Sequence, residues 1–131
     1  MVEEEIAFKN ILKTSDAISL VHHLVDSFIG RHEEENFCSL VIVGRDKKIL
    51  AQTIAPDCSE HNAHIALVQA KAAVSGVEVL GTDRVNGKGQ IRGHFGGVTL
   101  ADKGFFVGFY IRHMTAKRFV EIIKEVSLKI D

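Results

Sequence analysis

Residues 96–114, GGVTLADKGFFVGFYIRHM, have the pattern of a complete β-hairpin, and this pattern leaves few folds open to the chain. An Asp-Lys-Gly turn separates two apolar runs, and Gly104 stands where a three-residue turn with a bulge favours a positive φ. The preceding pair, Gly96 and Gly97, offers backbone that a ligand or another strand can approach closely. The stretch therefore predicts an antiparallel sheet, and its glycine pair is a candidate ligand contact.

Two further β-rich runs lie earlier in the chain, at residues 37–44 and 49–54, on either side of a polar stretch, Arg45-Asp46-Lys47-Lys48. Their spacing predicts a second antiparallel hairpin, which Pro56 ends. Residues 76–97 are rich in glycine and predict a long loop, with a short strand at residues 77–80. A binding loop and plain flexibility are both open interpretations of this segment.

Apolar residues at helical spacing predict three helices. The first covers residues 14–29, with Thr14 or Ser15 as its cap, the second covers residues 59–75, and the third begins at Thr115. The resulting order is helix, two strands, helix, loop, hairpin and helix, which indicates an α+β fold in which helices pack on an antiparallel sheet. A chain of 131 residues fits one such domain.

The second predicted helix is apolar on two sides. Its alanines recur at three- and four-residue spacing and form a smooth strip that permits close approach of another backbone: Ala63, Ala66, Ala70 and Ala73. Ile65, Val68 and Ala72 lie away from this strip. A helix that is apolar on two sides is usually buried on two sides, so we expect the second partner to be another subunit and the protein to be a homo-oligomer.

Charge and composition exclude several classes of partner. The formal net charge is −1, with 16 basic and 17 acidic residues, which gives no general attraction to nucleic acid or to an anionic membrane. No leader opens the chain and no apolar run approaches the roughly 20 residues that cross a bilayer, so we expect a cytoplasmic protein. Cys38 and Cys58 have neither CxxC spacing nor the density of a disulfide scaffold, and we expect both to be reduced thiols.

Candidate binding residues are polar side chains on otherwise apolar elements. His61, His64 and Lys71 project from one sector of the second helix. Lys71 needs an acidic partner, carbonyl groups or an anionic ligand if this alanine-rich helix is buried; the alternative is that it reaches solvent at the helix edge. His94 precedes the glycine pair and His113 ends the last strand, so we expect the two at one edge of the sheet. We expect no structural metal, because the histidines lack the further ligands of zinc motifs.

Several short motifs along the chain form a set. They are the helix start at residues 12–17, the hairpin at residues 43–51, Ala70-Lys71-Ala72, and Gly96-Gly97-Val98 with Gly108. Together they resemble the GlcG/HbpS-like family, which includes the C-terminal domain of PduO-type proteins, over residues 12–126. The chain departs from the family at Gly44-Arg45-Asp46-Lys47, at Thr99, and at Ile111-Arg112-His113-Met114, where it places bulk and charge that the family lacks. The resemblance implies a profilin-like or PAS-like fold, homo-oligomers, and haem or a corrinoid as ligand.

Three functional hypotheses follow. The first is a homo-oligomeric module that binds haem, a corrinoid or another anionic small molecule. The second is a small enzyme in which His61 or His64 is a general base and Lys71 holds an anionic substrate. The third is a non-catalytic interaction subunit on which every histidine is incidental. The candidate ligand-binding residues are His61, His64, Lys71, His94, Gly96, Gly97 and His113.

Overall fold

The computed structural model describes residues 2–30 and 34–130, which fold into helices and strands in the expected α+β arrangement. The main elements are α1 (Val2–Gly30), β1 (Phe37–Val43), β2 (Ile49–Ile54), α2 (Glu60–Val74), β3 (Leu80–Arg84), β4 (Ile91–Leu100), β5 (Phe105–Ile111) and α3 (Ala116–Ser127). Two single-turn 3₁₀ helices, η1 (Glu34–Asn36) and η2 (Val85–Gly87), join neighbouring elements.

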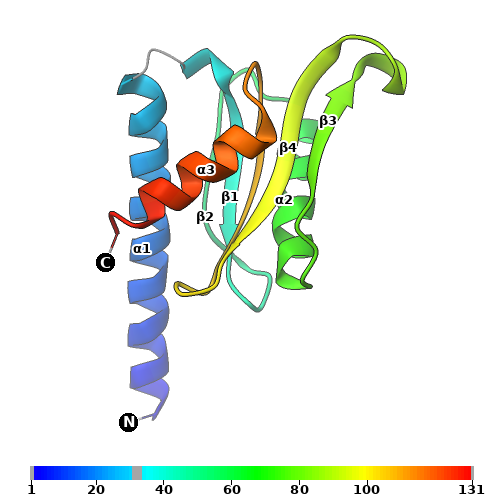
Figure 1. Cartoon of the computed structure of the whole chain (residues 1–131). Coiled ribbons are helices and arrows are strands. Elements are labelled where there is room, and N and C mark those ends of the chain that lie inside the picture. The colour runs from blue at the N-terminus through cyan, green and yellow to red at the C-terminus, as the bar shows by residue number, and fades with distance from the viewer. Residues whose placement is uncertain (1, 31–33, 131) are drawn as a thin grey trace.

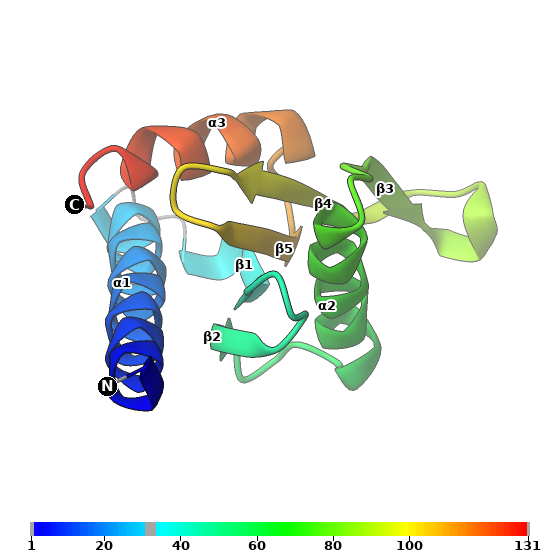
Figure 2. The same cartoon turned by 90° about the horizontal axis from the view of Figure 1, so that it is seen from below.

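The five strands form one antiparallel sheet in the order β2-β1-β5-β4-β3 (Figure 1). Helices cover both faces: α1 and α3 lie on one face, and α2 lies on the other (Figure 2). The two hairpins predicted from the sequence, β1–β2 and β4–β5, are both confirmed, and Gly104 in the second turn has a φ of +67°. The tip of the β3–β4 hairpin extends away from the helices (Figure 1).

The larger core lies between the sheet and the pair α1 and α3. The ring of Phe119 on α3 packs edge-on against Phe109 on β5, with centroids 4.7 Å apart and an interplanar angle of 86°. Phe28 on α1 contacts the same Phe119 ring at 5.4 Å. The predicted apolar stripe of the last helix is buried in this core, and Thr115 caps the helix by accepting a hydrogen bond from the N–H of Arg118 at 3.1 Å.

On the other face, α2 lies unusually close to the sheet because both surfaces are made of small residues. Ala66, Ala70 and Ala73 are buried. A Cβ atom built on Gly108 of β5 would stand 1.9 Å from the carbonyl oxygen of Ala66, so only glycine fits there. The backbone that the alanine strip approaches is therefore that of the protein's own sheet. Val68, on the far side of the helix, is 44% exposed in this chain.

The first helix is longer than its sequence signals predicted. We expected it to begin at Thr14 or Ser15, but α1 begins at Val2 and continues through both residues. Hydroxyl side chains favour caps, yet a helix with no glycine or proline before them can continue past them. Figure 1 shows the first half of α1 projecting beyond the sheet. Despite this length, none of the helices in residues 2–30 and 34–130 is both long and apolar enough to cross a bilayer.

The expected loop over residues 76–97 is instead mostly a hairpin. The predicted strand at residues 77–80 is displaced to β3, and β4 begins well before the glycine pair. The glycines of these strands lie under aromatic rings: a Cβ atom on Gly81 would stand 2.4 Å from the ring of Phe95, and one on Gly93 would stand 2.4 Å from the ring of Tyr110. A glycine in the sequence can belong to a loop or to a strand position that another group approaches closely, and the sequence alone does not distinguish the two.

Candidate functional site

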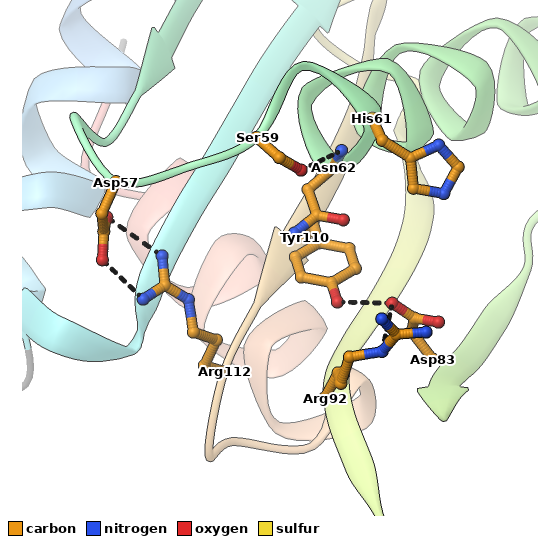
Figure 3. A pocket seen from close by; sticks show the side chains of 8 residues that line it. All are labelled: Asp57, Ser59, His61, Asn62, Asp83, Arg92, Tyr110 and Arg112. Atoms are coloured by element: carbon orange, nitrogen blue, oxygen red, sulfur yellow. Dashed lines mark hydrogen bonds and ion pairs between the residues drawn. The ribbon is translucent and has the colours of Figure 1, made fainter. Parts of the chain in front are cut away.

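A cleft of about 370 Å³ opens between the first turn of α2 and the ends of β3, β4 and β5 (Figure 3). We call it the polar cleft. Its lining is Asp57, Ser59, His61, Asn62, Asp83, Arg92, Tyr110 and Arg112. The volume lies near the lower end of the range typical of small-molecule sites, and four charged side chains reach into it.

The start of α2 is fixed in place on one side of the polar cleft. Ser59 is the N-cap, with an extended backbone, and its hydroxyl accepts a hydrogen bond from the N–H of Asn62 at 3.1 Å. The carbonyl of Asn62 in turn accepts a hydrogen bond from the buried Ser39 hydroxyl on β1 at 3.2 Å. The remaining N–H groups of the first turn have no partner within the helix, so this end carries a partial positive charge.

Arg112, just after β5, forms the first ion pair of the polar cleft. Its guanidinium donates two hydrogen bonds to the Asp57 carboxylate, at 2.8 and 3.1 Å (Figure 3). The hydrogen bond from Arg112 holds the pKa of the exposed Asp57 below its usual range, and Asp57 raises the pKa of Arg112. The backbone N–H of Arg112 also donates to the carbonyl of Asn36 at 2.7 Å, which anchors the residue to the start of β1.

Tyr110 and Arg92 converge on Asp83 on the other side of the polar cleft (Figure 3). The Tyr110 hydroxyl donates a hydrogen bond to Asp83 Oδ2 at 2.7 Å, while Arg92 Nε lies 4.0 Å from the same oxygen. Burial, followed by the hydrogen bond to Asp83, raises the pKa of Tyr110. The Tyr110 ring reaches this position because residue 93 beneath it is a glycine.

The perturbed groups of the polar cleft are each locked in one protonation state. Asp57 is held ionised, while Tyr110 and Arg112 are held protonated. Cys58, beside Asp57, has its pKa raised to about 12 by burial and by the adjacent Cys38 thiol, so it is not a thiolate at neutral pH. Groups that exchange protons in catalysis are usually tuned toward neutral pH, and these shifts run the other way. The arrangement is suited to hold a polar molecule by fixed donors and acceptors.

Of the second-helix candidates, the structure brings only His61 to the polar cleft. His64 and Lys71 are exposed further along α2. Because a helix rises about 1.5 Å per residue, Lys71 stands about 15 Å along the axis from His61. Of the two interpretations that the sequence left open for Lys71, the structure bears out the second: the lysine is exposed to solvent. One small substrate cannot contact both Lys71 and His61.

The candidates of the last hairpin lie apart from the polar cleft. His94 lies opposite Ile111 in the β4–β5 ladder, in a shallow hollow of about 340 Å³ that Leu80, Ala116 and Lys117 also line. Burial, followed by Arg84 and then His113, lowers the pKa of His94. Ile111, the register partner of His94, stands two positions before His113, so the two histidines lie at the same end of the β4–β5 pair.

The glycine pair has no room for a ligand. A Cβ atom on Gly96 would stand 2.8 Å from the ring of Phe109, and one on Gly97 would stand 2.7 Å from the carbonyl oxygen of Gln69. The close approach that the sequence predicted at Gly96 and Gly97 is therefore made by the protein itself.

Most of the polar cleft was missed by sequence reasoning. Its residues come from four separate segments: the turn before α2, the first turn of α2, the β3–β4 hairpin, and the end of β5. Ser59 carried a recognisable helix-start signal, but Asp83 and Arg92 were read as loop residues. No local spacing joins Asp57 to Arg112, which are paired only in the folded chain.

Comparison with protein-family models, with curated proteins and with solved structures finds no match to this chain. The resemblance to the GlcG/HbpS-like family therefore stays a prediction, as does the cytoplasmic location. Among the described residues, no group of three or more histidine, cysteine, aspartate or glutamate side chains is arranged to hold a metal ion.

The polar cleft does not fit a tetrapyrrole. A porphyrin or corrin ring presents broad apolar faces that are bound by apolar walls. Four charged side chains line this cleft, and two of them form a bidentate ion pair across its side. The hollow at His94 suits such a ligand better, because the imidazole there is kept neutral and the surroundings include Leu80 and Ala116.

Proposed function

We propose that the protein is a small-molecule-binding module whose ligand is a small carboxylate or phosphate held in the polar cleft. The observation that carries this proposal is the convergence on one cleft of Arg92 and the backbone N–H end of α2, whose first turn also carries the acidic Glu60. The fixed protonation states of Asp57, Tyr110 and Arg112 favour binding over proton-transfer chemistry.

Arg92 is the cation that retains donors for a ligand. Arg112 donates two hydrogen bonds to Asp57. Arg92 Nε lies 4.0 Å from Asp83, beyond direct hydrogen bonding, Arg92 Nη2 donates one long hydrogen bond to the carbonyl of Arg84 at 3.4 Å, and the side chain is 58% exposed. Asp83 is already held at 2.7 Å by Tyr110. An incoming anion can therefore pair with the Arg92 guanidinium without breaking a strong internal contact.

Calorimetric titration with inorganic phosphate and with citrate tests this proposal. Arg92→Gln removes the charge, and we expect it to weaken binding about tenfold to a hundredfold, since a charge-assisted hydrogen bond contributes about 1.5–3 kcal/mol. Arg118→Gln is the matched control, because Arg118 pairs with Glu121 on α3, across the sheet from the polar cleft. No binding of either anion, or equal weakening by both substitutions, would contradict the proposal.

The enzyme hypothesis has less support. Its acid–base residue would be His61, which is the candidate that lines the polar cleft. Lys71 is too distant to hold the same small substrate. Haem or corrinoid binding remains a second candidate at the hollow of His94, favoured by the neutral imidazole. When haem is added, a shift of its Soret band that His94→Ala abolishes and His61→Ala preserves would support it. An unshifted band would rule it out.

We further propose that the module self-associates. β3 is an edge of the sheet, and apolar side chains are exposed on α2 and on the segment that leads into β3: Val68 at 44% and Val77 at 53%. We propose that a second copy of the chain covers both the exposed side of α2 and the segment that precedes β3. Sedimentation of Val68→Glu should show a lighter species than wild type, while Leu128→Glu, at an exposed site just after α3, should not. A monomeric wild type would refute it.

A further inference from the structure

The two cysteines have no part in the proposed ligand site, yet the fold brings them together. Cys38 is completely buried in β1, and Cys58 is partly buried in the turn that precedes α2. Twenty positions separate them in the sequence. Cys58 follows Asp57 of the Arg112–Asp57 ion pair in the sequence, and Cys38 lies two positions after Asn36, whose carbonyl accepts a hydrogen bond from the Arg112 N–H.

Backbone hydrogen bonds fix the relative position of the two residues. The N–H of Ala55 donates to the carbonyl of Cys38 at 2.8 Å, which continues the β1–β2 ladder by one residue. The chain then turns back, and the N–H of Cys58 donates to the carbonyl of Ala55 at 2.9 Å. Ala55 is therefore hydrogen-bonded to both cysteines, through its N–H to Cys38 and through its carbonyl to Cys58.

Cys38 stands at a bulge in β1. The register between β1 and β5 shifts between Phe37 and Ser39, so Cys38 is the extra residue. Such a residue departs from the strict alternation of a strand, and bulges commonly re-aim a side chain in this way. The buried Cys38 accordingly does not join the cluster of apolar residues under α1 and α3.

The surroundings of the thiols agree with this placement. The pKa of Arg112 is raised first by Asp57 and then by Cys38, and the pKa of Cys58 is raised by burial and then by Cys38, which agrees with a position of the Cys38 side chain toward both residues. Arg112, just after β5, pairs with Asp57, in the turn that carries Cys58, and its backbone N–H is hydrogen-bonded to Asn36 at the start of β1.

We propose that Cys38 and Cys58 are a reversible dithiol–disulfide pair that hydrogen peroxide oxidises. In the first step, the small ionised fraction of the more accessible Cys58 attacks peroxide and becomes a sulfenic acid, and the thiol proton and the departing hydroxide form one water; this step is slow because burial raises the pKa of Cys58 to about 12. In the second step, the Cys38 sulfur attacks the Cys58 sulfur, the S–S bond forms, and the sulfenic hydroxyl leaves as a second water. Two S–H bonds are lost and one peroxide is reduced to two waters. The bond ties the segment that carries Asp57 and Ser59 to β1, and so fixes one wall of the polar cleft.

The test uses the full chain treated with hydrogen peroxide and then with iodoacetamide under denaturing conditions. We expect a monomer whose mass is lower by two hydrogens, with neither cysteine alkylated, and full alkylation of both after treatment with dithiothreitol. Cys58→Ser should prevent the mass loss and leave Cys38 alkylated. This readout does not depend on any ligand, so it is independent of the proposed function.

Three results would overturn the inference. They are alkylation of both cysteines after peroxide, a disulfide-linked dimer in place of the internal bond, and accumulation of sulfinic acid on Cys58 while Cys38 stays alkylatable. Each would mean that the two sulfurs are too far apart, or too rigidly held, to reach disulfide geometry.

Discussion

The contact between α2 and β5 depends on the absence of a side chain at one position, so Gly108→Ala tests the packing of the whole helix. The added Cβ would stand 1.9 Å from the carbonyl oxygen of Ala66 and 2.6 Å from the backbone nitrogen of Ala70. An ordinary contact needs about 3.4 Å, so α2 must lift by about 1.5 Å. Both opposing atoms are backbone, and no rotamer change can relieve the clash.

Lifting α2 separates it from the apolar residues beneath. Val41, Val43 and Phe106 are buried against the alanine strip and would lose that cover. Overpacking of a tight core costs about 1–3 kcal/mol and occasionally more, and we expect the upper end because the obstacle is backbone. In a domain of this size that corresponds to a fall in melting temperature of about 10 °C.

Thermal and urea unfolding of matched variants measure the effect. Gly30→Ala is the control, because a Cβ there has no atom within 4 Å, and we expect it to change stability by less than about 1 kcal/mol. If Gly108→Ala unfolds at the same temperature as Gly30→Ala, the close packing of α2 on β5 is wrong.

Three further predictions concern single residues. Tyr110→Phe removes the hydrogen bond to Asp83 and should lower urea stability by about 1 kcal/mol, because that carboxylate is only partly buried; an unchanged midpoint would contradict the contact. The lowered pKa of His94 means that the unfolded chain binds a proton more readily, so stability should fall as pH drops below about 6.5, and His94→Gln should flatten that part of the profile. Ala70→Glu should unfold the chain, as judged by circular dichroism, because Ala70 is completely buried under the sheet.

The sequence by itself determined the elements that form through local patterns. Alternating apolar runs around short polar turns predicted both confirmed hairpins, and the alanine spacing of α2 predicted a close backbone approach. These features are readable because turn chemistry and helical periodicity act over a few residues. The same local signals misplaced the start of α1, because a cap residue stops a helix only when the preceding chain prefers another conformation.

Only the tertiary structure decided the β3–β4 hairpin and the polar cleft. The strand glycines at 81 and 93 look like loop residues until Phe95 and Tyr110 are seen to cover them. The cleft exists because the turn before α2 and the ends of three strands meet at one edge of the sheet. Its Arg112–Asp57 ion pair joins residues 55 positions apart in the chain, and such a contact forms when packing of the sheet and helices brings their backbones together, which no local pattern encodes.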